Sequence, residues 1–283
     1  MDFQDRVFRA VFFGASVLSA GVTVAVLGFM ILLSLPVLKM GFLWDVLTSP
    51  WSPGRGQFGI LPMMAGTLAM AFLSLVVSLP ISLGCAFFME ILHPRGAGAL
   101  LKKLVHFMTA VPTVIYGFVG VFLLVPLVRE FFAYGSGMCI LSASLMLGLV
   151  ISPTLILFFS ESFARVPQHY LNAVDALGGT VFQKLRHVIL PQAWPGMLTG
   201  MVLAFGRAMG DTLIALMISG NAVLMPSSLL DSTRTLTAHI ALIFAADFDS
   251  TEFKILFISG IVLYGMTSLG ILFARYFHKR ALP

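Results

Sequence analysis

Residues 172–221 read NAVDALGGTVFQKLRHVILPQAWPGMLTGMVLAFGRAMGDTLIALMISGN, and the fold can be worked out from this stretch. Its first half predicts a short helix that ends at Gly178-Gly179 and a second, amphipathic helix that stops at Leu190-Pro191. Its second half is an apolar segment long enough to cross a bilayer, with Arg207 and Asp211 near its middle. A charged side chain at the bilayer centre costs on the order of 2.5–3.5 kcal/mol even on a lenient scale, so the two charges indicate a function.

The composition excludes an ordinary soluble domain. Hydrophobic residues make up 59% of the chain, charged residues only 10%, and the mean hydropathy is +1.00, whereas soluble domains carry about 25% charged residues. The formal net charge is +5, but the basic residues are scattered between apolar segments and form no basic face. We therefore expect an all-α integral membrane protein in a lipid bilayer, with no nucleic-acid partner.

Six segments are long enough to cross a membrane, since a helix needs about 20 apolar residues to do so. They lie at about 10–38, 60–91, 104–128, 137–160, 193–224 and 253–275. The first is far longer than the hydrophobic region of a cleaved signal peptide, so we expect it to remain as an anchor. The predicted domains are an N-terminal helix with an outer loop (1–58), a core of five transmembrane helices (59–277) and a cytoplasmic tail (278–283).

Lysine and arginine in the connecting segments predict the orientation, because cytoplasmic loops are enriched in basic residues. Eleven lie on one side: Arg6, Arg9, Arg95, Lys102, Lys103, Arg165, Lys184, Arg186, Arg275, Lys279 and Arg280. Five lie on the other: Lys39, Arg55, Arg129, Arg234 and Lys254. Both termini are thus expected in the cytoplasm, and segment 225–252, with Asp231 and Asp249, outside. That segment is acidic enough to meet a soluble partner, although a plain solvated loop explains it equally well.

Residue types that often bind ligands are isolated in this chain. Cys85 and Cys139 lie in apolar segments without a CxxC motif or a histidine cluster, so we interpret them as buried thiols and expect no metal and no other cofactor. His239 alone makes no metal site. Trp44 and Trp51 are interpreted as membrane-interface anchors, with a ligand-binding role as the alternative.

The first half of the opening stretch predicts a helix-turn-helix. Gly178-Gly179 supplies residues that tolerate a positive φ, which the end of a helix often requires. Thr180 can cap the next helix, in which Val181, Leu185 and Val188 share one face at helical spacing. We expect this element to lie along the inner face of the membrane and to project into the cytoplasm. A plain interfacial helix is the alternative.

The same element resembles the coupling motif of binding-protein-dependent ABC import permeases, whose cytoplasmic loop reads roughly E-A-A-x-x-L-G with an L-P about a dozen residues later. The matching positions are Ala173, Leu177-Gly178, Leu190-Pro191 and Pro195-Gly196, while Asn172 replaces the usual Glu and Val174 the usual Ala. The resemblance implies the type I ABC importer permease fold, with a cytoplasmic coupling helix that docks into a groove of an ATPase subunit. The implied coupling residues are Asn172, Ala173, Asp175, Ala176, Leu177, Gly178 and Gly179.

Further positions resemble the phosphate-specific permeases, and in particular their PstC-type subunit. Residues 206–212 with Ser219-Gly220-Asn221 look like the family's R-A-x-G-E-T/A…G-N run, with Asp211 in place of the usual Glu. Residues 234–241 are similar to its R-T-L-T-x-x-I-A segment. Tyr116-Gly117 and Gly66-Thr67 also match, so that the resemblance covers about 59–277.

This resemblance implies a transmembrane subunit of an ATP-driven importer of inorganic phosphate in a bacterial or archaeal cytoplasmic (inner) membrane. It implies a PstA-like second permease subunit, in a heterodimer rather than a homodimer. Two copies of an ABC ATPase subunit and a periplasmic or extracellular phosphate-binding protein would complete the assembly. Molybdate, tungstate and sulfate importers share the coupling loop, so another oxyanion is the alternative substrate.

Arg207, Asp211, Thr212 and Asn221 are the candidate residues of the substrate path. Arg207 and Asp211 are four apart, so on one helix they would share a face and could pair in an empty path. The arginine offers a planar donor fork suited to a tetrahedral oxyanion. The aspartate could accept a hydrogen bond from a protonated oxyanion and repel one without a proton, such as sulfate. A buried ion pair that only fixes helix packing is the alternative.

Glycines in the same span predict close helix contact. Gly196 and Gly200, then Gly206 and Gly210, are each four apart, the spacing of small residues that lets helices approach closely. We expect this span to pack against its counterpart in the second permease subunit, with the charges at or near the interface. Gly210 could instead loosen the helix.

The chain lacks the G-x-x-x-x-G-K-[ST] motif of an ATPase, so we expect a transport subunit that is not itself an enzyme, with ATP hydrolysis in a separate chain. A secondary anion transporter would also place an arginine in the membrane, but such folds often show a duplicated half or a pair of broken helices, which the sequence does not reveal. A membrane-embedded enzyme would need a nucleophile-base pair or a metal cluster. The permease is therefore the favoured reading.

Overall fold

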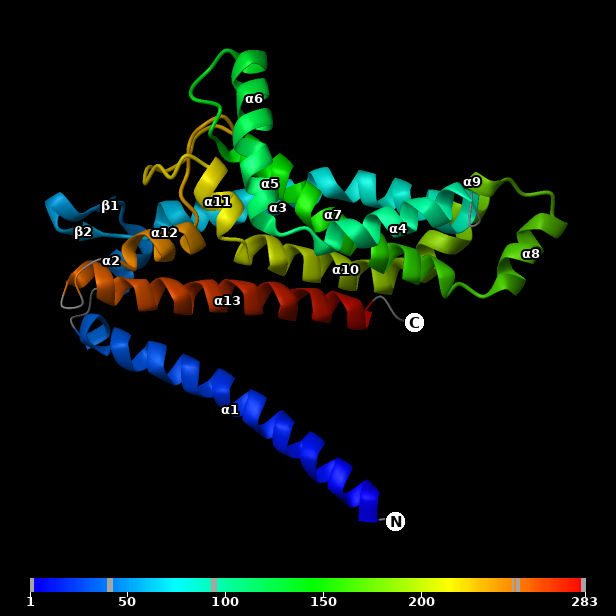
Figure 1. Ribbon diagram of the computed structural model, residues 1–283, viewed down its shortest axis with the longest axis horizontal. Helices are drawn as coiled ribbons and strands as arrows, with labels where there is room; N and C mark the ends of the chain where they lie inside the picture. The colour runs from blue at the N-terminus through cyan, green and yellow to red at the C-terminus, as the bar shows by residue number, and fades with distance from the viewer. Residues whose placement is uncertain (1–2, 40–42, 93–95, 246, 248–249, 281–283) are drawn as a thin grey trace.

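The computed structural model describes residues 3–39, 43–92, 96–245, 247 and 250–280, and helices make up most of them (Figure 1). Within these residues six helical segments are long and apolar enough to cross a membrane, which confirms the predicted number. They are Val7–Pro36, Leu61–Leu92, Thr113–Phe132, Ile140–Ala164, Val181–Gly210 and Thr251–Leu272. Of the predicted charged and terminal residues, Arg95, Asp249 and residues 281–283 lie outside the described part of the chain.

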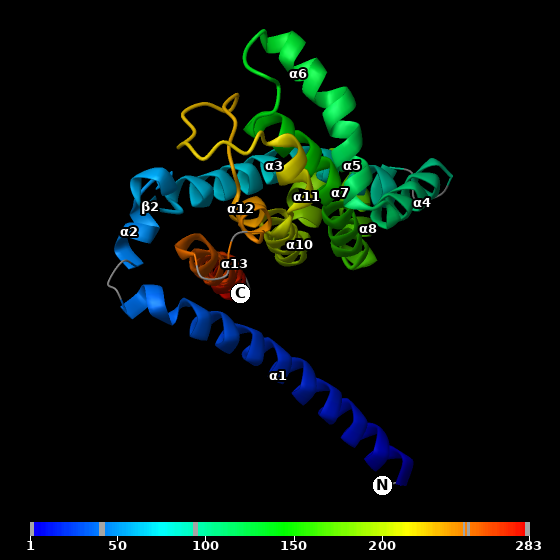
Figure 2. The ribbon, with the colours of Figure 1, turned by 60° about the vertical axis from the view of Figure 1, so that its left-hand side comes forward.

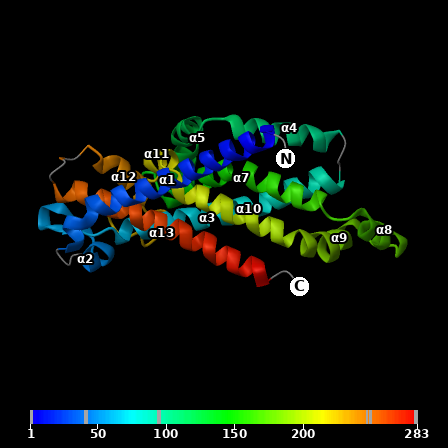
Figure 3. The same cartoon turned by 90° about the horizontal axis from the view of Figure 1, so that it is seen from below.

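Three long helices form the centre of the bundle: α3 (Leu61–Phe87), α7 (Ile140–Ala164) and α10 (Leu190–Gly210). They lie side by side in Figures 1 and 3, with α7 the most buried of the six spans. The seam between α3 and α7 is lined by small polar side chains, namely Ser74, Ser78, Ser82, Ser144 and Ser152. Because serines are small and can bond to backbone carbonyls, they let two apolar helices approach closely.

Two helices lie outside this centre. Helix α13 (Thr251–Arg280) packs along α10. Helix α1 (Phe3–Lys39) touches α13 through Phe29 and Phe257, whose ring centroids are 6.2 Å apart, and diverges from the bundle toward its N-terminus (Figures 1 and 2). Most described side chains of α1 are exposed. The division of the chain into an accessory first helix and a core of five helices stays a prediction.

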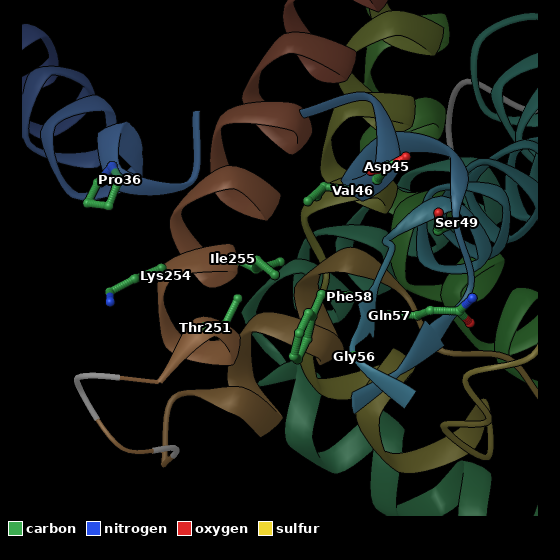
Figure 4. A pocket seen from close by; sticks show the side chains of 10 residues that line it. All are labelled: Pro36, Asp45, Val46, Ser49, Gly56, Gln57, Phe58, Thr251, Lys254 and Ile255. Carbon is green, nitrogen blue, oxygen red and sulfur yellow. The ribbon is translucent and has the colours of Figure 1, made fainter. Parts of the chain in front are cut away.

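One end of the bundle carries a small β-hairpin. After α2 (Leu43–Thr48), strands β1 (Trp51–Ser52) and β2 (Gln57–Phe58) pair in antiparallel register around the short helix η1 (Pro53–Arg55). A cavity of about 440 Å³ lies between this hairpin and the ends of α1 and α13, lined among others by Pro36, Phe58 and Lys254 (Figure 4). The candidate path residues are not among those that line it.

The third predicted span, 104–128, is wrong as a single helix. The chain forms α4 (Ala97–Ala110), breaks at Val111-Pro112, and continues as α5 (Thr113–Val119), the π-helical turn η3 (Gly120–Leu124) and α6 (Val125–Phe132). Proline has no N–H to donate and forces the residue before it out of the helical region, and Val111 is accordingly extended, with ψ of 124°. Helix α4 packs on α7, whereas α6 projects from the bundle (Figures 1 and 2).

The fifth predicted span, 193–224, is also wrong in both its start and its end. Leu190-Pro191 does not stop the preceding helix: α9 (Val181–Lys184) continues through the π-helical turn η4 (Leu185–Ile189) directly into α10. The proline is tolerated because it lies in the first turn of α10, and the Leu190 N–H reaches the carbonyl of Leu185 across the wider turn. At the other end α10 stops at Gly210, and a separate helix α11 (Leu213–Ile218) follows.

Candidate functional site

The predicted helix-turn-helix is present at the end of the bundle opposite the β-hairpin (Figure 1). Helix α8 (Gln168–Ala176) ends before Gly178, which has a φ of +72° that favours glycine. Thr180 caps α9 as predicted: its hydroxyl accepts from the Gln183 N–H at 3.3 Å, and the Gln183 side chain accepts from the Thr180 N–H at 2.7 Å. Lys184 Nζ lies 2.5 Å from Asp175 Oδ1 and ties the second helix to the first.

Apolar side chains of this element are exposed. Leu177 at the turn is 88% exposed, and Phe182 on α9 is 64% exposed. Asn172, Ala173, Asp175 and Ala176 are exposed as well, whereas Gly179 is half-buried because Val174 packs on it. An exposed apolar patch of this kind is typical of a surface that another protein covers.

Arg207 lies in the last turn of α10, and its guanidinium is held from the neighbouring helix. The Nη1 atom donates to the Thr154 hydroxyl of α7 at 3.1 Å. The side chain is exposed on the surface of this single chain. Its charge lies within electrostatic reach of Tyr116 and Asp211. The position therefore presents a fixed cation at the end of a membrane-spanning helix.

Asp211 is separated from Arg207 by the end of the helix, so the predicted pair on one helix face is wrong. Asp211 has an extended backbone, with ψ of 121°, and its Oδ1 accepts from the Ile214 N–H at 2.9 Å. Its carbonyl accepts from the Thr237 hydroxyl at 3.0 Å. The carboxylate thus satisfies a backbone donor at the start of α11, where the chain otherwise leaves N–H groups unpaired.

The segment after α11 folds back toward the bundle. Asn221 adopts a left-handed backbone with φ of +57°, and its side-chain amide donates to the Leu216 carbonyl at 2.6 Å. Arg234 Nε donates to the Asn221 carbonyl at 3.1 Å. Helix α12 (Leu236–Ile243) then begins with Thr235 as its cap and returns the chain to α3.

Several positions of the sequence motifs meet in space although they are far apart in the chain. The Thr67 hydroxyl accepts from the Leu236 N–H at 2.9 Å, and a Cβ added at Gly66 would collide with Thr233. A Cβ added at Gly117 would lie 2.6 Å from the sulfur of Met217, so α5 packs closely on α11. The motif residues thus join α3 to the start of α12 and α5 to α11, an arrangement that the sequence alone did not predict.

The other candidate residues are placed in two environments. Thr212 is half-exposed beside Asp211. A Cβ added at Gly196 or Gly200 would strike Ser162 or Phe158, so this pair faces α7 of the same chain. Gly206 and Gly210 have open space around them, so the predicted contact with a second subunit stays a prediction for that pair.

Glu90 is a charged site that sequence reasoning missed. It lies in the π-helical turn η2 (Phe88–Leu92), is largely buried, and accepts from the Ser160 hydroxyl. Lys102 Nζ of α4 lies 3.1 Å from its Oε1. The signal was available, since Glu90 is a lone carboxylate at the end of a long apolar segment.

Asp231 organises the loop between α11 and α12. Its Oδ2 accepts from the Ser227 N–H at 2.9 Å, from the Ser227 hydroxyl at 2.9 Å and from the Ser228 N–H at 2.8 Å. These donors hold the pKa of the Asp231 carboxyl below its ordinary value. The loop between α11 and α12 is therefore an ordered structure.

Comparison with known proteins identifies the family and the fold of the chain. Residues 78–282 match the family described as binding-protein-dependent transport system inner membrane component. The probable ABC transporter permease protein YqgH of Bacillus subtilis is 32% identical over 233 residues, which are 81% of this chain and 75% of that protein. The probable phosphate transport system permease protein PstC of Methanocaldococcus jannaschii is 28% identical over 278 residues, or 91% of this chain and 88% of that protein.

Solved structures share the fold. A chain of the inward-facing MetNI methionine ABC transporter has a TM-score of 0.60 and 17% identity, and the match covers 77% of this chain and 94% of that one. A chain of a bacterial ABC transporter that imports the acidic polysaccharide alginate has a TM-score of 0.63 and 13% identity, with 98% and 100% covered. These matches confirm the predicted type I ABC importer permease fold. Since the family match extends over far more than half of the sequence, the chain belongs to the binding-protein-dependent transport system inner membrane component family.

Proposed function

We propose that this chain is a transmembrane subunit of an ABC importer of inorganic phosphate and forms the translocation path with a second, PstA-like permease subunit. The observation that carries the proposal is the position of Arg207, exposed at the end of α10 beside a helix break that also holds Asp211. Relatives named as phosphate permeases, such as those of Methanocaldococcus jannaschii and Pasteurella multocida, support the substrate. Molybdate, tungstate or sulfate is the second candidate, because the coupling loop does not distinguish these anions.

The path residues have complementary chemistry for a partly protonated anion. A guanidinium donates to two oxygens of a tetrahedral oxyanion and stays charged at any accessible pH. The Thr154 hydroxyl restrains this guanidinium. The Asp211 carboxylate accepts from a protonated phosphate oxygen, whereas sulfate has no proton to donate at neutral pH. Thr212 and Asn221 complete the set of polar groups near the break.

The remaining partners follow from the exposed ends of the bundle. The patch around Leu177 docks on one of two ABC ATPase subunits, which supply the hydrolysis that this chain does not perform. A phosphate-binding protein delivers the anion to the opposite end, at the hairpin and the loop of Asp231. The membrane is the cytoplasmic (inner) membrane of a bacterium or archaeon, with both termini and α8 in the cytoplasm.

Transport in vesicles tests the substrate and its site. The chain is reconstituted with its second permease, ATPase and binding protein, and uptake of labelled phosphate is measured with ATP inside or outside. Arg207→Ala should reduce uptake at least about tenfold, since hydrogen bonds to charged groups contribute about 1.5–3 kcal/mol. Lys103→Ala, at an exposed position of α4, is the control. Uptake driven by an ion gradient without the ATPase would contradict the proposal.

Association with the ATPase tests the docking patch. Leu177→Asp should abolish copurification of the ATPase, because a charge would replace the apolar side chain at the centre of the contact. Leu100→Asp is the matched control, since Leu100 is also exposed but lies on α4. Retained association in the Leu177 variant would exclude this turn as the docking site.

A further inference from the structure

The imidazole side chain of His239, on α12, is buried without a hydrogen-bond partner among the described residues. The residue is fully buried, and neither Nδ1 nor Nε2 has a partner among the side chains and backbone that the structure describes. Burial lowers the pKa of the imidazole to about 3, and the charge of Arg234 lowers it further in the same direction. The ring is therefore neutral at physiological pH and still lacks a partner for its one N–H and its one acceptor nitrogen. A buried polar group of this kind destabilises the state in which it occurs.

The neighbour of His239 is Trp51 of the β-hairpin. The two ring centroids are 4.4 Å apart and the planes meet at 87°, an edge-to-face contact. Trp51 also packs edge-to-face on Phe58, its partner across the hairpin. The hairpin thus covers α12 and keeps water away from the imidazole.

Helix α12 also contacts the proposed substrate path, through Thr237, which lies two residues before His239. The Thr237 hydroxyl donates to the carbonyl of Asp211 at 3.0 Å. It also lies 2.9 Å from the hydroxyl of Thr235, which caps α12. Thr237 and His239 therefore lie on the same eight-residue helix, so a displacement of that helix at Trp51 would also displace the hydroxyl that donates to Asp211.

We propose that His239 is a positioning residue for transport, acting with Trp51 as a latch between the outer hairpin and the helix break. In the state described here the hairpin holds α12 in contact with Asp211, and the unpaired imidazole makes this packing less stable. When the hairpin lifts, the imidazole gains hydrogen bonds to water and α12 releases Asp211. The inference depends on the proposed substrate path at Arg207 and Asp211.

An apolar replacement tests the latch. His239→Leu should raise the midpoint of thermal unfolding by about 2–8 °C, because the unpaired nitrogens are gone, and should lower ATP-driven uptake several-fold, because release is slower. His106→Leu, at an exposed position of α4, should change neither quantity. A histidine that only fills the core predicts a lower unfolding midpoint, or a higher one with unchanged uptake, and either result would overturn the proposal.

The fluorescence of Trp51 gives a readout that does not depend on the substrate. The chain has three tryptophans, and Trp44 and Trp194 are both partly exposed, so the double variant Trp44→Phe/Trp194→Phe leaves Trp51 as the only tryptophan of this chain. This chain alone is produced with 5-hydroxytryptophan, so that the emission from position 51 can be excited apart from that of the tryptophans in the partner subunits. In the assembled complex, acrylamide should quench Trp51 little at rest and more when ATP and the binding protein are added. Constant quenching throughout the cycle would overturn the latch. If phosphate is not the substrate, wild-type uptake fails while the unfolding and quenching measurements still decide.

Discussion

Arg207 and Asp211 are four residues apart in the sequence, yet Arg207 lies in the last turn of α10, Asp211 lies in the extended link between α10 and α11, and the two bind different partners. Arg207 donates to Thr154 of α7, whereas Asp211 accepts from Ile214 at the start of α11. No ion pair between the two neutralises them in this structure. The guanidinium therefore keeps donors available to an anion, and the carboxylate has a structural task that can be separated from selectivity by mutation.

Thr154→Val should weaken substrate binding without removing the cation. The variant has the same shape but loses the acceptor that restrains Arg207, so the guanidinium samples more orientations and the KM for the anion should rise about tenfold. Uptake rates at several anion concentrations measure the change. Thr199→Val on α10, whose hydroxyl donates to the Pro195 carbonyl of the same helix, is the matched control. An unchanged KM would show that the contact with Thr154 has no part in binding.

Two substitutions at Asp211 should separate its two tasks. Asp211→Asn keeps an oxygen that can accept from the Ile214 N–H, so the fold should persist, but it removes the charge that would repel sulfate. Asp211→Ala also removes the backbone contact and should lower stability by about 0.5–2 kcal/mol, as the loss of a helix cap does. Competition of phosphate uptake by sulfate measures selectivity, and thermal unfolding measures stability. If sulfate competes equally well against the wild type and Asp211→Asn, the carboxylate does not select the anion.

The two glycine pairs of α10 should respond in opposite ways to alanine. Gly200→Ala places a Cβ 2.6 Å from the Phe158 Cβ and should destabilise the chain by about 1–3 kcal/mol. Gly206→Ala meets open space and should stabilise the isolated chain by about 0.5–1 kcal/mol, because alanine favours a helix. If a second permease subunit covers this face, Gly206→Ala should also reduce copurification of that subunit. Full assembly of the variant would place the interface elsewhere.

Glu90 and Lys102 should be energetically coupled, because they form an ion pair. Lys102→Met removes the cation from the largely buried carboxylate and, among the described contacts, leaves it the Ser160 hydroxyl. The variant should destabilise the chain by about 1–2 kcal/mol, less than for a fully buried pair since Lys102 is half-exposed. Adding Glu90→Gln to this variant should restore part of the lost stability, because the carboxylate charge without a cation is then gone. A double-mutant cycle by thermal unfolding measures the coupling, and strictly additive effects would exclude it.

Local rules predicted much of this structure because they need only neighbouring residues. Apolar length predicted the number of spans, and Gly178 and Thr180 have the backbone and the cap expected for their residue types. The break at Val111-Pro112 could also have been predicted, because proline restricts the backbone of the residue before it. The prediction of one span followed the apolar length of the segment instead.

The features that were missed depend on distant parts of the chain. The break after Gly210 involves Thr237, which lies on another helix and binds the Asp211 carbonyl. The partners of Glu90 come from α4 and α7, and no spacing rule connects them. Leu190-Pro191 looked like a stop because the wider turn of η4 cannot be read from local propensity.

The unbroken passage from α9 through η4 into α10 places the proposed docking turn next to one end of a single helical segment and Arg207, the proposed anion ligand, at the other end. The 30 residues of Val181–Gly210 measure about 45 Å at about 1.5 Å per residue. A tilt of about 5° would thus displace one end by about 4 Å relative to the other, at this rise per residue. If the proposed ATPase partner moves the docking turn, the displacement can reach Arg207 through one continuous helical segment, with no break at Pro191.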